Sequence, residues 1–164
     1  MKNGKIYILS GKVNSGKTTA ISEWSKKIFN CGGILQPKIN GKRFLVDIRT
    51  GEKKLLSVSD QTAKRDVISV GKYSFSYSAF DWAQKVLRKE MVNEPPWLII
   101  DEYGKLELKG LGLEPVIGML IDSISKSKKT DLIIVIREYL VDNFLKKYEL
   151  PAQIINKENL QELI

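Results

Sequence analysis

Apolar runs without polar–apolar alternation recur along this chain, and a stretch with helical periodicity follows most of them. The runs predict strands buried on both faces at Lys5–Ser10, Trp97–Ile100 and Leu132–Ile136, with a last short strand at Ile154-Ile155. The periodic stretches predict helices over these ranges: Lys17–Asn30, Ser78–Val92, Leu113–Lys126, Glu138–Tyr148 and Lys157–Ile164. Because strands alternate with helices, we expect the α/β fold class, with a mainly parallel central sheet between two layers of helices.

Between the first two helices the pattern changes to short strands separated by turn residues. Gly32-Gly33 is expected to end the first helix, because glycine is common just after a helix. An antiparallel β-meander is then predicted over about residues 34–58, with Asn40-Gly41 and Thr50-Gly51 as its turns. Its predicted strands are Ile34–Ile39, Arg43–Arg49 and Lys53–Val58. Asp60–Asp66 is expected to be a polar loop, and Val67–Phe75 to be irregular with a short strand.

The first predicted strand leads into a complete phosphate-binding motif, G-x-x-x-x-G-K-[ST]. A strand before it and a helix after it are the context that the motif requires, because the helix N-terminus points unpaired N–H groups at a polyphosphate. Lys17 is expected to reach the β- and γ-phosphates, and the Thr18 hydroxyl to bind Mg²⁺. The predicted nucleotide-binding residues are Gly11, Lys12, Val13, Asn14, Ser15, Gly16, Lys17, Thr18 and Thr19.

A second half of the site is predicted at the carboxyl end of the strand Trp97–Ile100. Asp101 follows this strand as the aspartate of a Walker B motif would, so we expect it to bind Mg²⁺ together with Thr18. Glu102 is the candidate that activates water, and the alternative is a solvated loop carboxylate. Glu107 is a second candidate, with a helix-entry role as its alternative.

Arg137 directly follows the predicted strand Leu132–Ile136, which we expect to be central in the sheet. An arginine there could contact the γ-phosphate and stabilise the charge of the transition state, so it is a third catalytic candidate besides Lys17 and Glu102. The alternative is a surface or helix-entry arginine. Weaker candidates of the same kind are Arg43, Arg49 and Arg88.

The composition limits the residue types available for acid–base catalysis and indicates where the protein is expected in the cell. The 164 residues fit one domain, 1–164, and contain no histidine, which leaves Asp, Glu and Lys for acid–base catalysis. The single cysteine, Cys31, is expected to be a small apolar residue near the end of the first helix. The apolar runs are too short to span a bilayer, and no apolar signal region precedes the first strand, so we expect a cytoplasmic protein without membrane contact.

Four segments resemble the small P-loop nucleoside-triphosphatase family that includes the cancer-related nucleoside-triphosphatase. They are the phosphate-binding loop, the glycine-basic meander from Gly33 to Glu52, Asp101-Glu102-Tyr103-Gly104-Lys105-Leu106-Glu107-Leu108 and, more weakly, Asn156-Lys157-Glu158-Asn159. The resemblance implies Mg²⁺-dependent, slow hydrolysis of nucleoside triphosphates to diphosphates and phosphate, with little base selectivity. It also implies a P-loop fold with an extra strand between the P-loop strand and the Walker B strand. Lys17, Thr18, Asp101 and Glu102 match the family residue by residue.

Two other functions stay open at this point. A kinase would transfer the γ-phosphoryl group to a nucleoside or another small acceptor, although no arginine-rich lid is evident in the sequence. A nucleotide-dependent nucleic-acid-binding switch is suggested by the net charge of +8 and by Tyr73, Tyr77 and Trp82. The charge also fits binding of a polyanion such as ATP, and lysine pairs of this kind usually form a solvated surface, so the charge alone does not decide between these functions; the sequence predicts no oligomeric state.

Overall fold

The computed structural model describes residues 3–127 and 129–164 and is built on one large sheet. Its strand order is β10-β1-β9-β8-β2-β4-β3, with β5 paired to β4. The parallel strands are β1 (Ile6–Gly11), β2 (Cys31–Leu35), β8 (Trp97–Tyr103), β9 (Asp131–Arg137) and β10 (Gln153–Ile155). One strand, β9, therefore separates the P-loop strand β1 from the predicted Walker B strand β8, as the resemblance implied.

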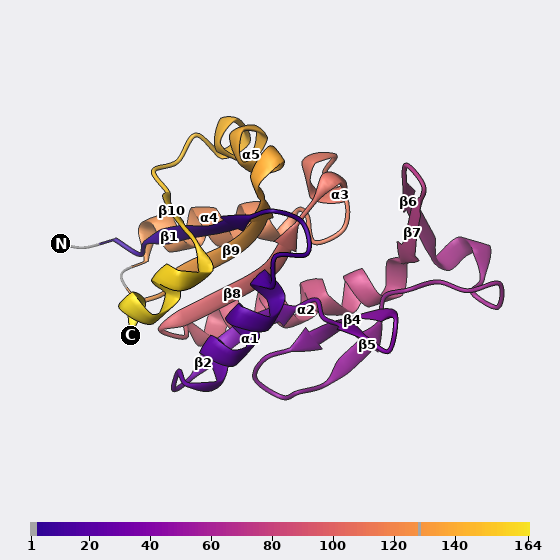
Figure 1. Cartoon of the computed structure of the whole chain (residues 1–164), viewed down its shortest axis with the longest axis horizontal. Coiled ribbons are helices and arrows are strands. Elements are labelled where there is room, and N and C mark those ends of the chain that lie inside the picture. The colour runs from indigo at the N-terminus through magenta and orange to yellow at the C-terminus, as the bar shows by residue number, and fades with distance from the viewer. Residues whose placement is uncertain (1–2, 128) are drawn as a thin grey trace.

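Helices cover both faces of this sheet (Figure 1). On one face lie α1 (Lys17–Lys26) and the 3₁₀ helix η3 (Lys157–Leu163). The other face is covered by α2 (Tyr77–Asn93), α4 (Val116–Lys126) and α5 (Val141–Tyr148). The shorter helices are α3 (Lys105–Leu108), η1 (Lys64–Asp66) and η2 (Glu138–Leu140). The expected α/β/α architecture with a mainly parallel sheet is confirmed.

The apolar runs form strands that are buried on both sides, for the reason predicted. In β1, Ile6 and Ile8 pack towards α4, whereas Tyr7 and Leu9 pack towards α1. All four are almost fully buried. Because helices cover both faces of the sheet, neither face of these strands meets solvent, and polar residues therefore do not alternate with apolar ones. No helix in the described part of the chain combines the length and apolar character needed to cross a membrane.

The predicted meander is present, but it continues the main sheet. β2 pairs with β8 in parallel on one side and with β4 (Lys42–Asp47) in antiparallel on the other. β3 (Lys38–Ile39) and β5 (Lys53–Leu55) complete it. Asn40 and Gly41 both adopt positive φ, as the predicted turn requires.

The assignment of Gly32-Gly33 as a helix stop was wrong. Helix α1 ends at Lys26, and both glycines lie inside β2. Gly33 has a φ of 124°, and a Cβ there would collide with the backbone of Ile99 in β8. Glycine is thus required by the close approach of two strands. Cys31 is buried as expected, but it begins β2.

The segment expected to be irregular forms a second, two-stranded sheet. β6 (Val67–Val70) and β7 (Tyr73–Ser76) pair in antiparallel, with Val70 opposite Tyr73 across a tight turn at Gly71-Lys72. This hairpin lies apart from the central sheet, at the right of Figure 1. Its partly buried apolar side chains, Ile68, Val70 and Phe75, pack against the core beside α2.

Candidate functional site: a phosphate-binding loop facing two carboxylates

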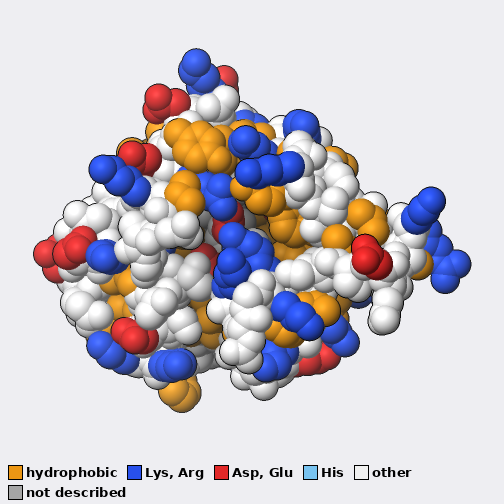
Figure 2. Space-filling view, turned by 45° about the vertical axis from the view of Figure 1, so that its right-hand side comes forward, with side chains coloured by type: hydrophobic (Ala, Val, Ile, Leu, Met, Phe, Trp, Pro, Cys, Tyr) orange, Lys and Arg blue, Asp and Glu red, His pale blue; other side chains and the backbone are white. Residues whose placement is uncertain are grey.

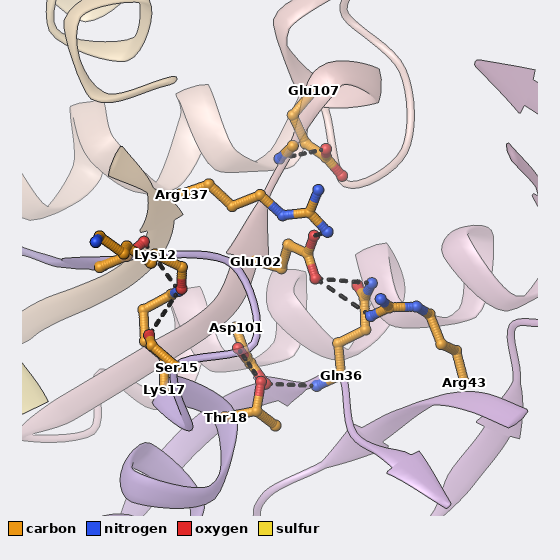
Figure 3. A network of polar contacts seen from close by, with 12 residues as sticks. Lys12, Ser15, Lys17, Thr18, Gln36, Arg43, Asp101, Glu102, Glu107 and Arg137 are labelled. Carbon is orange, nitrogen blue, oxygen red and sulfur yellow. Dashed lines mark hydrogen bonds and ion pairs between the residues drawn. The ribbon is translucent and has the colours of Figure 1, made fainter. Parts of the chain in front are cut away.

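The loop from Gly11 to Thr18 joins β1 to α1, and Lys17 holds it in shape. The Lys17 ammonium donates hydrogen bonds to the carbonyls of Gly11 (3.1 Å) and Lys12 (2.6 Å) and to the Ser15 hydroxyl (3.3 Å) (Figure 3). Gly16 has a φ of 85°, which is accessible to glycine without strain. The curled loop leaves its backbone N–H groups available to a ligand at the start of α1.

A cavity of about 360 Å³ opens over this loop. Its wall combines most of the predicted site residues, from Val13 to Thr19, with Asp101, Glu102 and Arg137. Gly11 and Lys12 are not part of this wall, but their carbonyls accept hydrogen bonds from Lys17. Residues far apart in the sequence are thus assembled around one space large enough for a polyphosphate.

Asp101 lies at the floor of the cavity, opposite Thr18. The Thr18 hydroxyl donates a hydrogen bond to Asp101 Oδ1 (3.2 Å), and the backbone N–H of Gln36 donates to Oδ2 (2.9 Å). Burial of the fully enclosed carboxyl raises its pKa to about 6, and the Gln36 hydrogen bond offsets part of this effect. A hydroxyl and a carboxylate side by side are oxygen ligands of the kind that Mg²⁺ prefers, so these residues fit that ion.

A bulge in β8 brings Glu102 to the same cavity. The register of β8 against β9 shifts between Ile100 and Tyr103, and Glu102 adopts a φ of 81°. Ile100 and Tyr103 can therefore both pack against the α2 side, while the two acidic residues between them line the cavity. Positive φ is unfavourable for a residue with a Cβ, and strain of this kind is concentrated at functional sites.

Two arginines hold the Glu102 carboxylate (Figure 3). Arg137 Nη2 lies 2.9 Å from Oε1, and Arg43 Nη1 lies 3.4 Å from Oε2. The Gln36 side-chain amide also donates to Oε2, at 3.4 Å. As expected, Arg137 comes from a central strand, since β9 lies between β1 and β8.

Sequence reasoning underrated Arg43 and missed Gln36 and Lys157. Gln36 directly follows β2, so a correct assignment of that strand would have placed it at the carboxyl edge of the sheet. Lys157 donates a hydrogen bond to the Ser15 carbonyl (2.9 Å), a contact without a sequence signal beyond the C-terminal segment noted above. Arg49 lies elsewhere, paired with Glu90, and Arg88 is exposed on α2.

Glu107 points away from the cavity over the P-loop. Its buried carboxylate accepts hydrogen bonds from the backbone N–H groups of Gly104 (2.9 Å) and Leu113 (3.2 Å). Burial raises the pKa of Glu107 to about 7, although these hydrogen bonds oppose the shift. Of its two predicted roles, the geometry favours helix entry: Glu107 closes the loop around α3.

A strand–loop–helix phosphate cradle that faces a buried aspartate is the arrangement of P-loop nucleotide-binding folds, and in this chain one strand, β9, lies between the two halves of the site. The family model described as NTPase matches residues 6–164, so the chain belongs to this NTPase family.

Curated relatives are nucleoside-triphosphatases named THEP1. The chain is 30% identical over 112 residues to that of Methanothermobacter thermautotrophicus, a match covering 62% of each chain. It is 33% identical over 116 residues to that of Korarchaeum cryptofilum, covering 65% of this chain and 57% of the relative. The matched part thus spans about three fifths of these relatives.

Solved structures extend the likeness to nearly the whole fold. The crystal structure of THEP1 from Aquifex aeolicus has a TM-score of 0.71 at 23% identity and covers 97% of this chain and 96% of its own. The solution structure of a human cancer-related nucleoside triphosphatase has a TM-score of 0.67 at 18% identity, with coverage of 98% and 95%. At these identities the likeness concerns the fold.

Proposed function

We propose that this protein hydrolyses nucleoside triphosphates to diphosphates and phosphate, slowly and with broad base tolerance. The observation that carries the proposal is the position of Glu102, held by Arg43 and Arg137 at the edge of the phosphate cavity. The family membership and the printed names of the relatives support the same activity.

The loop and its lysine are proposed to bind the triphosphate. Among the described residues, the Lys17 ammonium donates its hydrogen bonds to groups of its own loop, which preforms the curled backbone. Burial lowers the pKa of Lys17, and the nearby Glu102 carboxylate opposes this effect. The oxygen atoms of a bound polyphosphate would accept hydrogen bonds from the Lys17 ammonium and from the backbone N–H groups at the start of α1, including those of Thr18 and Thr19.

Thr18 and Asp101 are the residues that would hold Mg²⁺. The ion, when bound, neutralises charge on the β- and γ-phosphate oxygens. Within the described residues, no cluster of three or more His, Cys, Asp or Glu side chains forms another metal site. Asp101 is oriented for this role by the backbone N–H of Gln36.

Glu102 is proposed to accept a proton from the attacking water. The water oxygen bonds to the γ-phosphorus, and the bond from phosphorus to the β–γ bridging oxygen breaks. The arginines that now neutralise Glu102 line the phosphate cavity, and we propose that they release the carboxylate and bind oxygen atoms of the γ-phosphoryl group as its charge develops. That exchange would leave Glu102 available to the water.

The test is phosphate release from a mixture of nucleoside triphosphates with Mg²⁺, comparing the wild type with Glu102→Gln. We expect the variant to bind ATP and to lose most turnover, since the amide cannot accept the proton. Glu107→Gln is the matched control, a carboxylate of the same segment outside the phosphate cavity, and it should retain turnover. Equal turnover in wild type and Glu102→Gln would exclude Glu102 as the base.

A further inference from the structure

A second cavity of about 170 Å³ adjoins the phosphate cavity, and the proposed hydrolysis does not use it. The two share four residues: Gln36, Arg43, Glu102 and Arg137. These are the side chains that form the network around the Glu102 carboxylate in Figure 3. Whatever enters the second cavity therefore lies beside the groups assigned to the γ-phosphate.

The remaining wall of this cavity is mostly aromatic and aliphatic. The β6–β7 hairpin, α2 and η2 supply Val70, Tyr73, Phe75, Phe80, Tyr139 and Leu140, and the segment Gly104–Glu107 supplies the rest of the wall, including Lys105 and the buried Glu107. Phe75 and Phe80 pack edge to face with centroids 6.1 Å apart, which fixes one side. Tyr73 and Tyr139 are each 52% exposed, as residues at an open mouth would be. Figure 2 shows Lys and Arg side chains meeting hydrophobic ones in the hollow at the centre of its face.

The size of this cavity selects its occupant. An apolar cavity of roughly 150 Å³ in another protein binds benzene, so a cavity of this size admits one six-membered ring with a short substituent. An aromatic wall favours a flat ring, which can stack or pack edge to face. Contact with water is unfavourable for this apolar wall, so the hydrophobic effect favours a ring in its place.

The charge at the shared wall selects the functional group. Glu102 lines both cavities, and its carboxylate would repel an anionic acceptor but can accept the proton of a hydroxyl group. Arg43 and Arg137 stand on either side of it and can stabilise charge as a phosphoryl group passes from one cavity to the other.

We propose that this cavity binds a ring-sized aromatic alcohol and that the site transfers the γ-phosphoryl group of the nucleotide to its hydroxyl oxygen. The oxygen bonds to the γ-phosphorus, and the bond to the β–γ bridging oxygen breaks. The hydroxyl proton goes to Glu102, and the products are a phosphomonoester and a nucleoside diphosphate. The inference rests on the phosphate site of the proposed function, but hydrolysis becomes its side reaction, with water in place of the acceptor.

The experiment supplies saturating ATP and Mg²⁺ with benzyl alcohol or 3-pyridinemethanol as the probe, and toluene or 3-methylpyridine as matched rings without the hydroxyl. Phosphorus NMR separates the phosphomonoester from inorganic phosphate. We expect the alcohols to raise ADP formation roughly tenfold, as a positioned acceptor should, with the excess recovered as phosphomonoester. The rings without a hydroxyl should give no ester.

Val70→Trp tests the location, because the larger ring would fill the cavity from β6. Its matched control is Ser69→Trp, one residue away on the exposed side of the same strand. We expect Val70→Trp to abolish ester formation and binding of the ring probe, measured by ligand-detected NMR, while ATP hydrolysis stays at the wild-type rate. Ser69→Trp should behave as the wild type.

The failures of the two proposals are distinguishable. Absence of phosphate release without any alcohol contradicts the proposed hydrolysis. Absence of phosphomonoester with both alcohols, or ring binding that Val70→Trp leaves unchanged, overturns the acceptor proposal even when hydrolysis proceeds.

Discussion

Arg137 reaches Glu102 from the end of β9, and at 2.9 Å it is the nearer of the two arginines that hold this carboxylate. If it stabilises the γ-phosphoryl group during transfer, Arg137→Ala should lower kcat by about 10²-fold or more while ATP still binds, since one charged donor is lost. Steady-state kinetics and a binding titration separate the two effects. Arg88→Ala, on the exposed surface of α2, is the control. Unchanged turnover in Arg137→Ala would remove this residue from the mechanism.

Glu107, which closes the loop around α3, should make the stability of the fold depend on pH. Burial raises its pKa from 4.5 to about 7, so the folded protein binds a proton that the unfolded chain has released between these values. The stability that Glu107 contributes is therefore complete below about pH 4.5 and is lost as the pH rises through 7.

Glu107→Gln removes this titration. The unfolding free energy of the wild type, relative to that of Glu107→Gln, should fall by on the order of 3 kcal/mol between pH 4.5 and 7.5. Urea unfolding at the two pH values measures the difference, and Asp101, present in both proteins, cancels. A pH-independent difference would mean that Glu107 keeps an ordinary pKa.

At the scale of elements, β2 depends on Gly33 for its place beside β8. A Cβ at Gly33 would collide with the backbone of Ile99, and the positive φ adds strain. Gly33→Ala should therefore destabilise the fold by about 3 kcal/mol or more. Gly51→Ala also requires positive φ but meets no atom within 4 Å, so it should cost only about 1 kcal/mol. Equal losses for the two in chemical denaturation would exclude the strand contact as the cause.

The same element marks the limit of sequence-based prediction. The strands β1, β8 and β9 were predictable because burial on both faces leaves a continuous apolar run. The P-loop and Asp101 were predictable because each is defined by neighbours along the chain. Gly32-Gly33 carries the local signature of a helix stop, and only the approach of β8 explains its real place. Arg43 and Lys157 reach the site through tertiary pairing, which no local pattern encodes.

At the scale of the whole molecule, the C-terminal segment packs against the P-loop and α1. Lys157 donates to the Ser15 carbonyl at 2.9 Å, and the Trp24 indole donates to the Leu160 carbonyl at 2.8 Å. Loss of the first contact should loosen the loop, so Lys157→Ala is expected to raise the Kd for ATP about fivefold with little change in kcat.

Calorimetric titration with a non-hydrolysable ATP analogue measures this effect. Lys27→Ala is the control, because Lys27 contacts the same segment at Gln161 (3.5 Å) and lies outside the P-loop. A Kd for Lys157→Ala equal to that of the wild type would show that the contact has no part in nucleotide binding.

The position of β1 in the sheet has a consequence for the making of the protein. Ile6 pairs with Leu132, and Tyr7 pairs with Gln153. Both edges of the first strand therefore stay unpaired until the last third of the chain has been synthesised. At about 5–20 residues per second, a ribosome needs on the order of ten seconds to deliver these partners. Throughout that time an apolar strand with two open edges is exposed, so a nascent chain of this design should depend on chaperone protection until β9 emerges.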